Sequence, residues 1–466
     1  MPIKFFDTYS RQLEVFEPIA SPKVKIYTCG PTVYSFAHIG NFRAYVFEDL
    51  LQRHLEARGF EVERVMNLTD VDDKTIRGSR EAGVSLPEFT AKFKQSFFED
   101  IESLRIQRAT YFPAATEPEN LAKMIEMIAQ LLEQDIAYQA EDRSVYFRIS
   151  KYPDYGKLAH LNLAELRPTG RIQSDEYEKE NIGDFALWKA WDQKDGLVGW
   201  ETPWGKGRPG WHIECSAMAT RILGPEIDIH CGGVDNIFPH HEAEIAQSEC
   251  VNRKKFVRYW LHNAHLLVEG QKMSKSLGNF FTLRDLLEKG FSGRELRYAL
   301  IRVNYRLPLN FTFDGLREAR QSLLRIDEWV RRLQDIAGGA VADSQFAPAK
   351  SDKFFEALDD DLNISAALGE VFNQIRETNT SIDRHELTAG EATALLDWWK
   401  RINQVLQLQE EAESIPPQVT ALLEKRSKAR ADKNWSQSDA LRAEIESLGW
   451  LVKDTKEGQK LIKKSG

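Results

Sequence analysis

IYTCGPTVYSFAHIGN, residues 26–41, is the stretch of sequence that decides the fold. Val24 to Thr28 alternates polar and apolar residues that favour β-structure, and the Gly-Pro pair that follows ends this strand. From Ile39 to Leu55 apolar residues recur at helical spacing, so a helix begins close to His38. A strand that turns directly into a helix predicts a parallel α/β sheet, and the free N–H groups at such a helix start favour an anion.

The same stretch carries two side chains that could take part in catalysis or binding, the Cys29 thiol before the turn and the His38 imidazole after it. Gly40 would let a phosphate or a nucleobase approach the backbone closely. An ordinary strand, turn and helix, with His38 and Asn41 as capping residues, explains the tetrapeptide HIGN equally well when it is taken alone.

Strand and helix patterns alternate up to about residue 110 and resume with Ile227 to Cys231 and Tyr259 to Val268. The segment between them is turn-rich and charged, which indicates an insertion into one parallel sheet. Beyond about residue 315 strand patterns almost vanish, and long segments with apolar residues at helical spacing predict a helical bundle. An acidic stretch that ends in Pro-Pro, residues 410–417, indicates a linker to a last small module.

Composition excludes several classes of protein. Hydrophobic residues make up 42% and charged residues 29% of the 466-residue chain, which is typical of globular domains. No run approaches the roughly 18 apolar residues of a membrane helix. The N-terminus, MPIKFFDTYSRQ, lacks an apolar signal core, so we expect a cytoplasmic protein with no membrane partner. Four cysteines are too few for a disulfide framework and remain available as structural thiols, metal ligands or catalytic groups.

The charge is distributed unevenly along the chain. The net charge of −9 argues against indiscriminate binding of nucleic acid. Residues 425–464, however, carry eleven basic and six acidic side chains. This basic segment indicates either a local contact with a polyanion or a solvated charged tail.

Two further stretches contain side chains that could take part in catalysis or binding. The first is Phe238 to Glu244, FPHHEAE. It predicts a helix start with Pro at the favoured first position, and it places His240 and Glu244 four residues apart on one helix face. Together with cysteine thiolates these two side chains would suit tetrahedral zinc, although a capped surface helix explains the segment too. Spacing does not choose between Cys215 and Cys231 as a partner, nor does it show that Cys29 joins them.

The second stretch is GQKMSKSLGN, residues 270–279, which lies between a predicted strand and a helix that begins with a capping box at Thr282 and Asp285. Lys272 and Lys275 could close on a polyphosphate and stabilise the charge on a departing pyrophosphate, or they are simply exposed loop lysines. The occurrence of both HIGN and KMSKS, in this order and each between a strand and a helix, is improbable by chance.

Six motifs in this order resemble the class I aminoacyl-tRNA synthetases, and specifically the cysteinyl-tRNA synthetase family, over essentially the whole chain. The resemblance implies an α/β fold: a Rossmann-type parallel-sheet catalytic domain with an insertion, followed by an α-helical bundle and a small C-terminal anticodon-binding domain. The motifs are Cys29 to Tyr34, His38 to Asn41, Asn67 to Lys74, Gly210 to Ser216, Phe238 to Glu244, and Lys272 to Ser276.

The pattern and the resemblance together predict six parts of the chain. They are the two halves of the catalytic domain at residues 1–110 and 204–269, the connective insertion at 111–203, the KMSKS loop and stem-contact region at 270–315, the helical bundle at 316–409, and the anticodon-binding module at 418–466. The insertion shows no sign of a separate hydrolytic domain.

The resemblance also implies a role for individual residues. The zinc ligands would be Cys29, Cys215, His240 and Glu244, which leaves Cys231 and Cys250 as core residues. His38, Asn41, Lys272 and Lys275 would be catalytic and, with Gly40 and Asp235, would bind ATP. Thr69 and Trp211 would border the substrate cysteine, and Arg430, Trp435, Asp439 and Asp454 would contact the tRNA anticodon. Asn41 departs from the class pattern, which has a histidine there; its amide can donate a hydrogen bond but cannot be charged. Trp435 is equally well explained as a buried core residue.

The implied activity is that of a cysteine–tRNA ligase. L-cysteine would be activated by ATP as cysteinyl-adenylate and transferred to the 3′-terminal ribose of tRNA(Cys), with one Zn²⁺ per chain selecting the thiol and Mg²⁺ accompanying ATP. We expect a monomer. Two alternatives remain: a cysteine ligase of thiol biosynthesis that acts on an amino sugar, against which the basic C-terminal segment argues, and a non-catalytic paralogue that binds RNA or zinc, against which the intact KMSKS argues.

Overall fold

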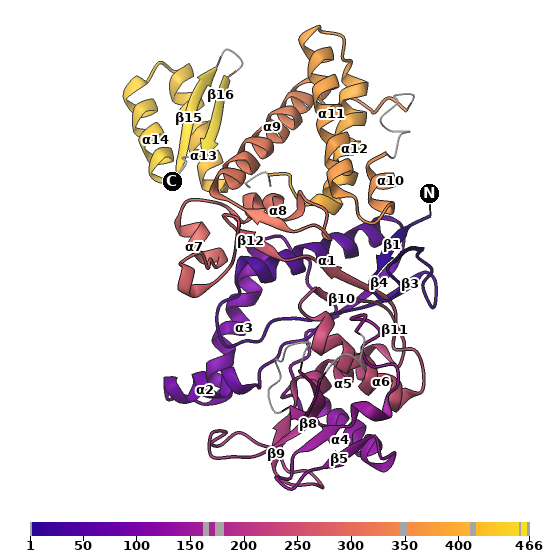
Figure 1. Ribbon diagram of the computed structural model, residues 1–466. Helices are drawn as coiled ribbons and strands as arrows, with labels where there is room; N and C mark the ends of the chain where they lie inside the picture. The colour runs from indigo at the N-terminus through magenta and orange to yellow at the C-terminus, as the bar shows by residue number, and fades with distance from the viewer. Residues whose placement is uncertain are drawn as a thin grey trace. The chain divides into compact units, whose positions relative to one another are not determined.

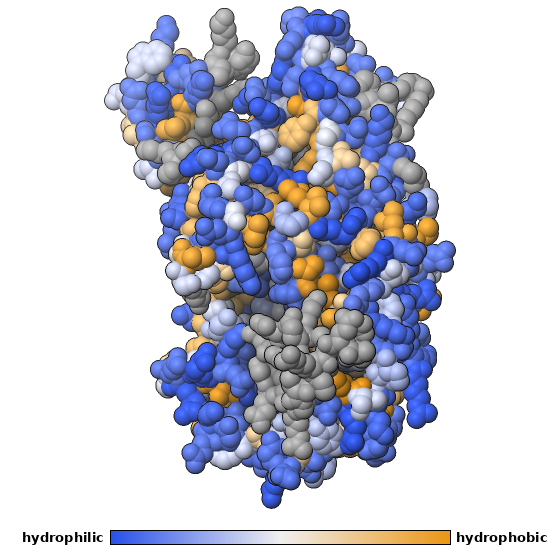
Figure 2. Space-filling view, in the orientation of Figure 1, coloured by the Kyte–Doolittle hydropathy of each residue, from blue (hydrophilic) through white to orange (hydrophobic). Residues whose placement is uncertain are grey.

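The computed structural model of the protein describes residues 2–161, 167–172, 181–344, 353–410, 416–455 and 458–463 (Figure 1). The chain divides into two compact units, Met1–Gln409 and Glu410–Gly466, which we describe separately. Hydrophilic residues cover most of the face seen in Figure 2, and hydrophobic ones form several separate groups on it. Among the described residues, none of the helices is long and apolar enough to cross a membrane.

A four-stranded parallel sheet forms the centre of the first unit. Its strand order is β11-β10-β3-β4, and every neighbouring pair is parallel. β3 lies between β4, the next strand of this sheet along the chain, and β10, which comes from beyond the insertion. The chain order therefore reverses at β3, and ligands of such sheets bind at this point, outside the carboxyl ends of the strands. The strands are β3 (Lys23–Thr28), β4 (Glu61–Met66), β10 (Ile227–Gly233) and β11 (Val257–Asn263).

Helix α1 (Ile39–Ala57) follows β3, as the sequence predicts. His38 is its N-cap: Nδ1 accepts the backbone N–H groups of Gly40 and Asn41. Apolar residues such as Val46, Leu50 and Leu51 pack into the core, and α1 also buries several charged side chains. The other helices of the same part of the first unit are α2 (Asp73–Ala82), α3 (Leu86–Ser103), α5 (Trp211–Leu223) and α6 (Glu242–Asn252).

The insertion after residue 111 contains a helix and a second sheet. The strand order is β5-β6-β8-β7, and β9 pairs with β8 on the way back to the central sheet. The sequence predicts one short strand here, Ser144 to Ile149, which corresponds to β6. The strands β5 and β9 have three residues each and show no periodicity, and β7 and the start of β8 fall within a charged segment whose pattern predicts turns. The elements are α4 (Pro118–Glu133), β5 (Ala137–Gln139), β6 (Val145–Phe147), β7 (Arg167–Ile172), β8 (Asn181–Ala190) and β9 (Gly207–Pro209).

The predicted continuous strand from Tyr259 to Val268 is wrong. β11 ends at Asn263, and β12 (Leu266–Val268) belongs to another sheet, where it pairs with β13 (Gln271–Lys272) and β14 (Leu309–Phe311). The backbone N–H of Ala264, between the two strands, donates to the carbonyl of Tyr305, so the chain leaves the central sheet there. This change of sheet carries the KMSKS segment away from the end of β11.

Helices follow the small sheet, as predicted. α9, α11 and α12 run side by side in Figure 1, and Trp329 of α9 packs edge to face against Trp399 of α12 with ring centroids 6.0 Å apart. Helix α8 lies between this bundle and α1. The helices are α7 (Leu283–Glu288), α8 (Gly293–Ile301), α9 (Phe313–Ala337), α10 (Lys353–Asp359), α11 (Ile364–Asp383) and α12 (Ala389–Leu406).

The second unit has a small core of its own. Val419, Leu422, Ile445, Trp450 and Val452 are buried together in it. Two helices pack on an antiparallel pair of strands: α13 (Pro417–Ala431), α14 (Trp435–Ser447), β15 (Trp450–Thr455) and β16 (Gly458–Lys463).

A buried carboxyl group on α1 makes stability depend on pH. Glu48 is 1% exposed, and burial raises its pKa from 4.5 to about 8, which the nearby Arg64 guanidinium and Thr28 hydroxyl counteract only in part. Between about pH 5 and pH 8 the folded protein therefore holds a proton that the unfolded chain has lost, so stability falls as pH rises.

Glu48→Gln is expected to abolish this dependence, because glutamine stays neutral. The variant should match the wild type at pH 5 and exceed it at pH 9 by on the order of a few kcal/mol in the free energy of unfolding. Urea unfolding at both pH values measures this difference. The exposed Glu61→Gln is the matched control; equal pH dependence of the wild type and Glu48→Gln would contradict the prediction.

Candidate active site and metal centre

The candidate site lies where the parallel strands end. Cys29 directly follows β3, and β10 ends in Gly232 and Gly233 beside it in the sheet. A side chain at Gly232 would collide with the ring of His241, since its Cβ would lie 2.7 Å from His241 Cε1. Glycine there allows the helix that carries the histidines to approach the strand end.

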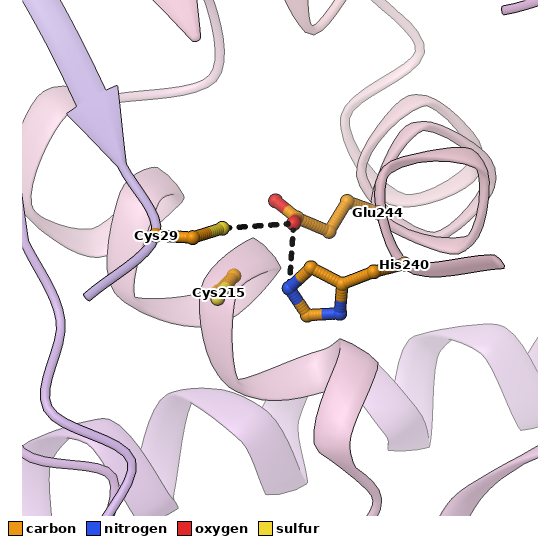
Figure 3. A group of neighbouring side chains, drawn as sticks. All are labelled: Cys29, Cys215, His240 and Glu244. Carbon is orange, nitrogen blue, oxygen red and sulfur yellow. Dashed lines mark hydrogen bonds and ion pairs between the residues drawn. The ribbon is translucent and has the colours of Figure 1, made fainter. Parts of the chain in front are cut away.

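Four side chains converge at this place: Cys29, Cys215, His240 and Glu244 (Figure 3). One ligand atom from each lies within 4.8 Å of all the others. Glu244 Oε1 is 3.0 Å from His240 Nε2 and 3.9 Å from Cys29 Sγ. Spacing in the sequence does not choose between Cys215 and Cys231; in the structure Cys29 and Cys215 join the group, and Cys231 does not belong to it.

Local structure explains how these donors meet. Cys215 lies one turn into α5, while a π-helical turn, Ile237–His241, precedes α6 and brings His240 and Glu244 together. The predicted helix start at Pro239 is therefore irregular, with Phe238 in extended conformation. His240 Nδ1 lies 3.0 Å from His212 Nδ1, which orients the ring so that Nε2 faces the other donors.

The donor set fits a zinc ion. Two sulfurs, one nitrogen and one oxygen are the ligand types of tetrahedral zinc sites, and donors about 2.0–2.3 Å from a shared metal lie 3–4 Å apart. Burial lowers the pKa of His240 to about 3, so its imidazole is neutral and able to ligate. The hydrogen bond to Cys215 and burial raise the pKa of the Cys29 thiol well above 9, and burial likewise raises that of Cys215. Metal binding would therefore release protons and weaken at low pH.

A second donor set overlaps the first and was missed by sequence reasoning. It combines Cys29 and Glu244 with His230 and His241. His230 Nε2 lies 2.9 Å from Glu244 Oε2, and His241 Nε2 lies 3.4 Å from Cys29 Sγ. The signal for His230 was available, because it is the one imidazole in a buried strand, IDIHCGG, directly before the predicted core residue Cys231.

Of the two predicted neighbours of the substrate cysteine, Trp211 contacts a residue of the metal centre, and Thr69 is bonded to Glu214, which precedes Cys215 in the chain. Trp211 is the first residue of α5, one turn before Cys215, and its ring stacks on His240 at 4.1 Å between centroids. Thr69 is buried, and its hydroxyl donates to Glu214 Oε2 over 3.0 Å. The neighbouring aspartates have structural partners: Asp72 caps α2, and Asp70 binds Lys94 at 2.6 Å.

The two signature segments, HIGN and KMSKS, meet in the structure. The Ile39 N–H donates to the carbonyl of Phe281 over 3.0 Å, and the His38 ring packs edge to face against Phe280 at 5.0 Å. Met273 also approaches Gly40, where an added Cβ would lie 3.1 Å from Met273 Cε and 2.9 Å from the His38 ring. Glycine at position 40 is thus required by packing in addition to any contact with a ligand.

Among the remaining predicted ATP residues, Lys272 and Asp235 are exposed and Asn41 is half-buried. Lys272 lies on β13, and Lys275 begins a short 3₁₀ turn. Within this loop the side-chain oxygen of Asn279 accepts a hydrogen bond from the Ser274 N–H over 2.8 Å. Asp235 lies in the turn after β10 and is exposed. The Asn41 side chain accepts from the His38 N–H over 3.1 Å, which completes a capping box.

The predicted anticodon residues all lie in the second unit. Trp435 is 58% exposed, so its interpretation as a core residue is wrong. The Arg430 guanidinium lies 5.8 Å from the Trp435 ring and binds Asp454 over 3.1 Å. Arg426, which is fully buried and was missed, also binds Asp454; Asp439 is exposed.

Comparisons with known proteins first define the class. Residues 15–321 match the family model of the tRNA synthetases class I (C) catalytic domain, 353–410 the DALR domain and 412–460 the cysteinyl-tRNA ligase anticodon binding domain. Among solved structures, methionyl-tRNA synthetase of Mycobacterium tuberculosis in complex with methionyl-adenylate is similar in fold, with a TM-score of 0.61, 15% identity, and coverage of 83% of this chain and 90% of that one. The fold is that of a class I aminoacyl-tRNA synthetase.

Curated relatives define the family more narrowly. The cysteine–tRNA ligase of Chlamydia felis is 52% identical over 98% of this chain and 97% of its own length. That of Protochlamydia amoebophila is 48% identical over 99% of this chain and 98% of its own length. The chain belongs to the cysteine–tRNA ligase family.

Proposed function

We propose that the chain activates L-cysteine with ATP to cysteinyl-adenylate and then transfers cysteine to the 3′-terminal ribose of tRNA(Cys). The convergence of two thiols, an imidazole and a carboxylate at the carboxyl ends of the strands carries this proposal, and the contact of HIGN with the segment that holds KMSKS supports it. The match of residues 412–460 to an anticodon binding domain supports tRNA as the acceptor.

The first half-reaction needs no protein nucleophile. The cysteine carboxylate attacks the α-phosphorus of ATP, the bond to pyrophosphate breaks, and negative charge develops on the departing oxygens. The start of α1 offers the positive end of the helix dipole to these phosphates, while its first backbone N–H groups are bonded to His38 and to the carbonyl of Phe281. His38, Asn41, Lys272 and Lys275 would orient them and stabilise the developing charge, with Mg²⁺ accompanying ATP.

Selection of cysteine over serine is the second chemical task. Shape alone in an apolar pocket discriminates only about 10- to 200-fold, and the two amino acids differ by one atom. A zinc ion held by Cys29, Cys215, His240 and Glu244 would supply a soft Lewis acid that prefers the thiolate of the substrate to a hydroxyl. Trp211, stacked on His240, and Thr69 would position the rest of the amino acid at that centre.

Cysteine-dependent ATP–pyrophosphate exchange, followed by transfer with and without tRNA, tests the proposal. We expect exchange in the absence of tRNA and charging of tRNA(Cys) when it is added. Exchange without charging would favour the amino-sugar ligase, and the absence of both reactions would favour a non-catalytic RNA-binding paralogue.

Deleting Gln418–Gly466 is expected to leave exchange intact and to lower the efficiency of tRNA charging by on the order of 100-fold. A tRNA bound by the second unit is held at a high effective concentration near the first, and the deletion removes this contribution. The deleted part has its own core, so the first unit keeps its packing. Initial rates of exchange and of tRNA charging measure the two effects.

A point substitution serves as the matched test of the same module. Trp435→Ala removes an exposed ring without opening the core, and loss of one stacked base should cost charging about 10-fold. Charging that is unaltered by the deletion would remove the proposed role of the second unit.

A further inference from the structure

Residues Gln404–Gln409, which we call the exit segment, are the last of the first unit before the chain continues into the second. The segment contains the end of α12 and a left-handed residue, Gln407, that terminates the helix. Carbonyl groups at a helix C-terminus have no partner within the helix and usually face water or a cap. Here five of the six carbonyls in the segment accept hydrogen bonds from arginine side chains.

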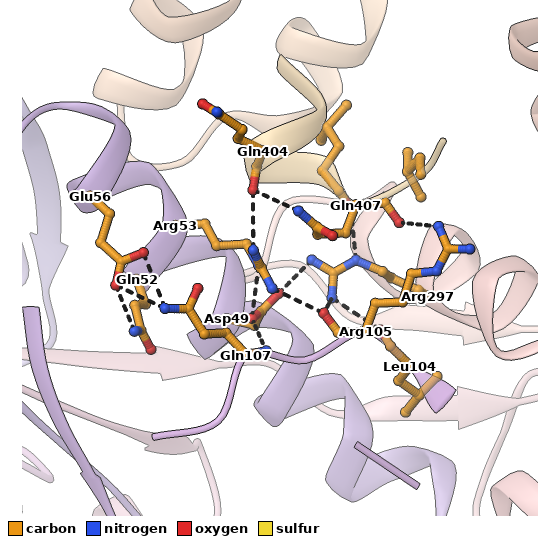
Figure 4. A network of polar contacts seen from close by, with 12 residues as sticks. Asp49, Gln52, Arg53, Glu56, Leu104, Arg105, Gln107, Arg297, Gln404 and Gln407 are labelled. Carbon is orange, nitrogen blue, oxygen red and sulfur yellow. Dashed lines mark hydrogen bonds and ion pairs between the residues drawn. The ribbon is translucent and has the colours of Figure 1, made fainter. Parts of the chain in front are cut away.

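Four arginines, which we call the arginine clamp, bind these carbonyls; Figure 4 shows Arg53, Arg105 and Arg297 at the segment. The clamp consists of Arg53, Arg105, Arg294 and Arg297, and they come from α1, the loop after α3, and α8. Their acceptors are the carbonyls of Gln404 (3.2 Å from Arg53 Nη1), Leu406 (2.7 Å from Arg297 Nε), Gln407 (3.2 Å from Arg105 Nη1), Leu408 (2.6 Å from Arg294 Nε) and Gln409 (bound by Arg105 Nη1).

The clamp is anchored on a buried carboxylate of α1. Asp49 is fully buried; it accepts from Arg53 Nε at 3.0 Å, from Arg297 Nη2, and from the Gln107 N–H at 2.6 Å. Burial alone would raise the pKa of Asp49, but the surrounding guanidinium groups hold it below its usual value, so the carboxylate is charged. Arg53 and Arg297 also bind the carbonyl of Arg105, which makes the anchor and the clamp one network.

Helix α1 therefore connects two distant features of the first unit. Its first turn carries His38 to Asn41 at the candidate ATP site, and its second half carries Asp49 and Arg53 at the exit segment. Buried, charge-assisted networks of this kind hold one geometry, because removing any donor leaves a desolvated acceptor behind.

We propose that the arginine clamp is a positioning device for tRNA charging: it fixes the point at which the second unit is tethered to the catalytic unit. The proposal rests on the proposed function of the chain. A tRNA that contacts both units binds more tightly when the exit segment is already ordered, because less conformational entropy is lost on binding. Adenylate formation, which needs only the first unit, does not depend on the clamp.

Arg105→Ala is the variant of choice, because Arg105 is half-buried, whereas Arg297 is part of the core. We expect KM for tRNA(Cys) to rise about tenfold, with pyrophosphate exchange unchanged. Arg105→Lys, which keeps a cationic donor, should recover part of the loss. Arg108→Ala is the matched control: it removes the same charge from the same loop, but Arg108 packs over Phe98 instead.

Hydrogen–deuterium exchange of the full chain gives a readout that does not depend on activity. The amides of Leu408 and Gln409 both donate to Asn403 Oδ1 over 2.7 Å, and they should exchange about tenfold faster in Arg105→Ala than in the wild type or in Arg108→Ala. Unchanged exchange there would show that Arg105 does not hold the segment.

The kinetic outcomes separate the two proposals. An unchanged KM for tRNA in Arg105→Ala, or an equal fall in pyrophosphate exchange and charging, would overturn the positioning role. A wild-type protein without cysteine-dependent exchange would overturn the proposed function itself, and the amide measurement would still report on the clamp.

Discussion

Cys29→Ala is expected to abolish zinc binding and to lower kcat/KM for cysteine in pyrophosphate exchange by more than about 100-fold. Even substitutions of residues that only hydrogen-bond to the ligands of a metal lower metal affinity or activity by about 10- to 100-fold. Cys29 belongs to both donor sets of the metal centre, so neither set survives its removal. KM for ATP should change little, because ATP would bind at the HIGN and KMSKS segments. Metal analysis of the purified protein and steady-state exchange kinetics measure these effects.

Two further cysteine variants make the experiment specific. Cys250→Ala removes a half-buried thiol outside both donor sets and should keep one zinc per chain. Cys215→Ala removes a ligand from the first set alone. Loss of zinc from Cys215→Ala identifies the set with His240, whereas retention of zinc identifies the set with His230 and His241. Full zinc content and an unchanged KM for cysteine in Cys29→Ala would contradict a metal centre at this place.

The sequence predicts the central fold well because its signals are local. A Gly-Pro turn between an alternating strand and a helical pattern is enough to predict β3 and the start of α1, and the capping box at Thr282 is visible in four residues. The short strands of the insertion have no such signal. The strand break at Asn263 was missed because both neighbouring segments are apolar, and the change of sheet depends on partners distant in the sequence.

The metal centre could be predicted only in part. The spacing of His240 and Glu244 places them on one face, but Cys29 and Cys215 join them through the order of the strands, which spacing does not reveal. The family resemblance supplied that choice. The clamp on the exit segment has no sequence signature at all, because its acceptors are backbone carbonyls that any residue carries.

Replacing His38 separates the helix cap that the structure shows from the phosphate contact that we propose. Nδ1 accepts the N–H groups of Gly40 at 3.1 Å and Asn41 at 3.3 Å, so in the neutral ring the proton lies on Nε2, which is then a donor for a phosphate oxygen. Asparagine is as good a helix N-cap as any residue but has no imidazole. His38→Asn should thus keep the cap and lose the donor.

We expect His38→Asn to lower kcat for pyrophosphate exchange by about 100- to 1,000-fold, the cost of one donor to developing charge, while thermal unfolding stays close to that of the wild type. His38→Ala should show the same loss of activity and an additional destabilisation of about 1 kcal/mol from the lost cap. Ser85→Ala, which removes the N-cap of α3, is the control for capping alone and should leave exchange unchanged. Wild-type exchange in His38→Asn would mean that the histidine of HIGN serves only to begin α1, and that the helix dipole and the two lysines of KMSKS carry the phosphate chemistry without it.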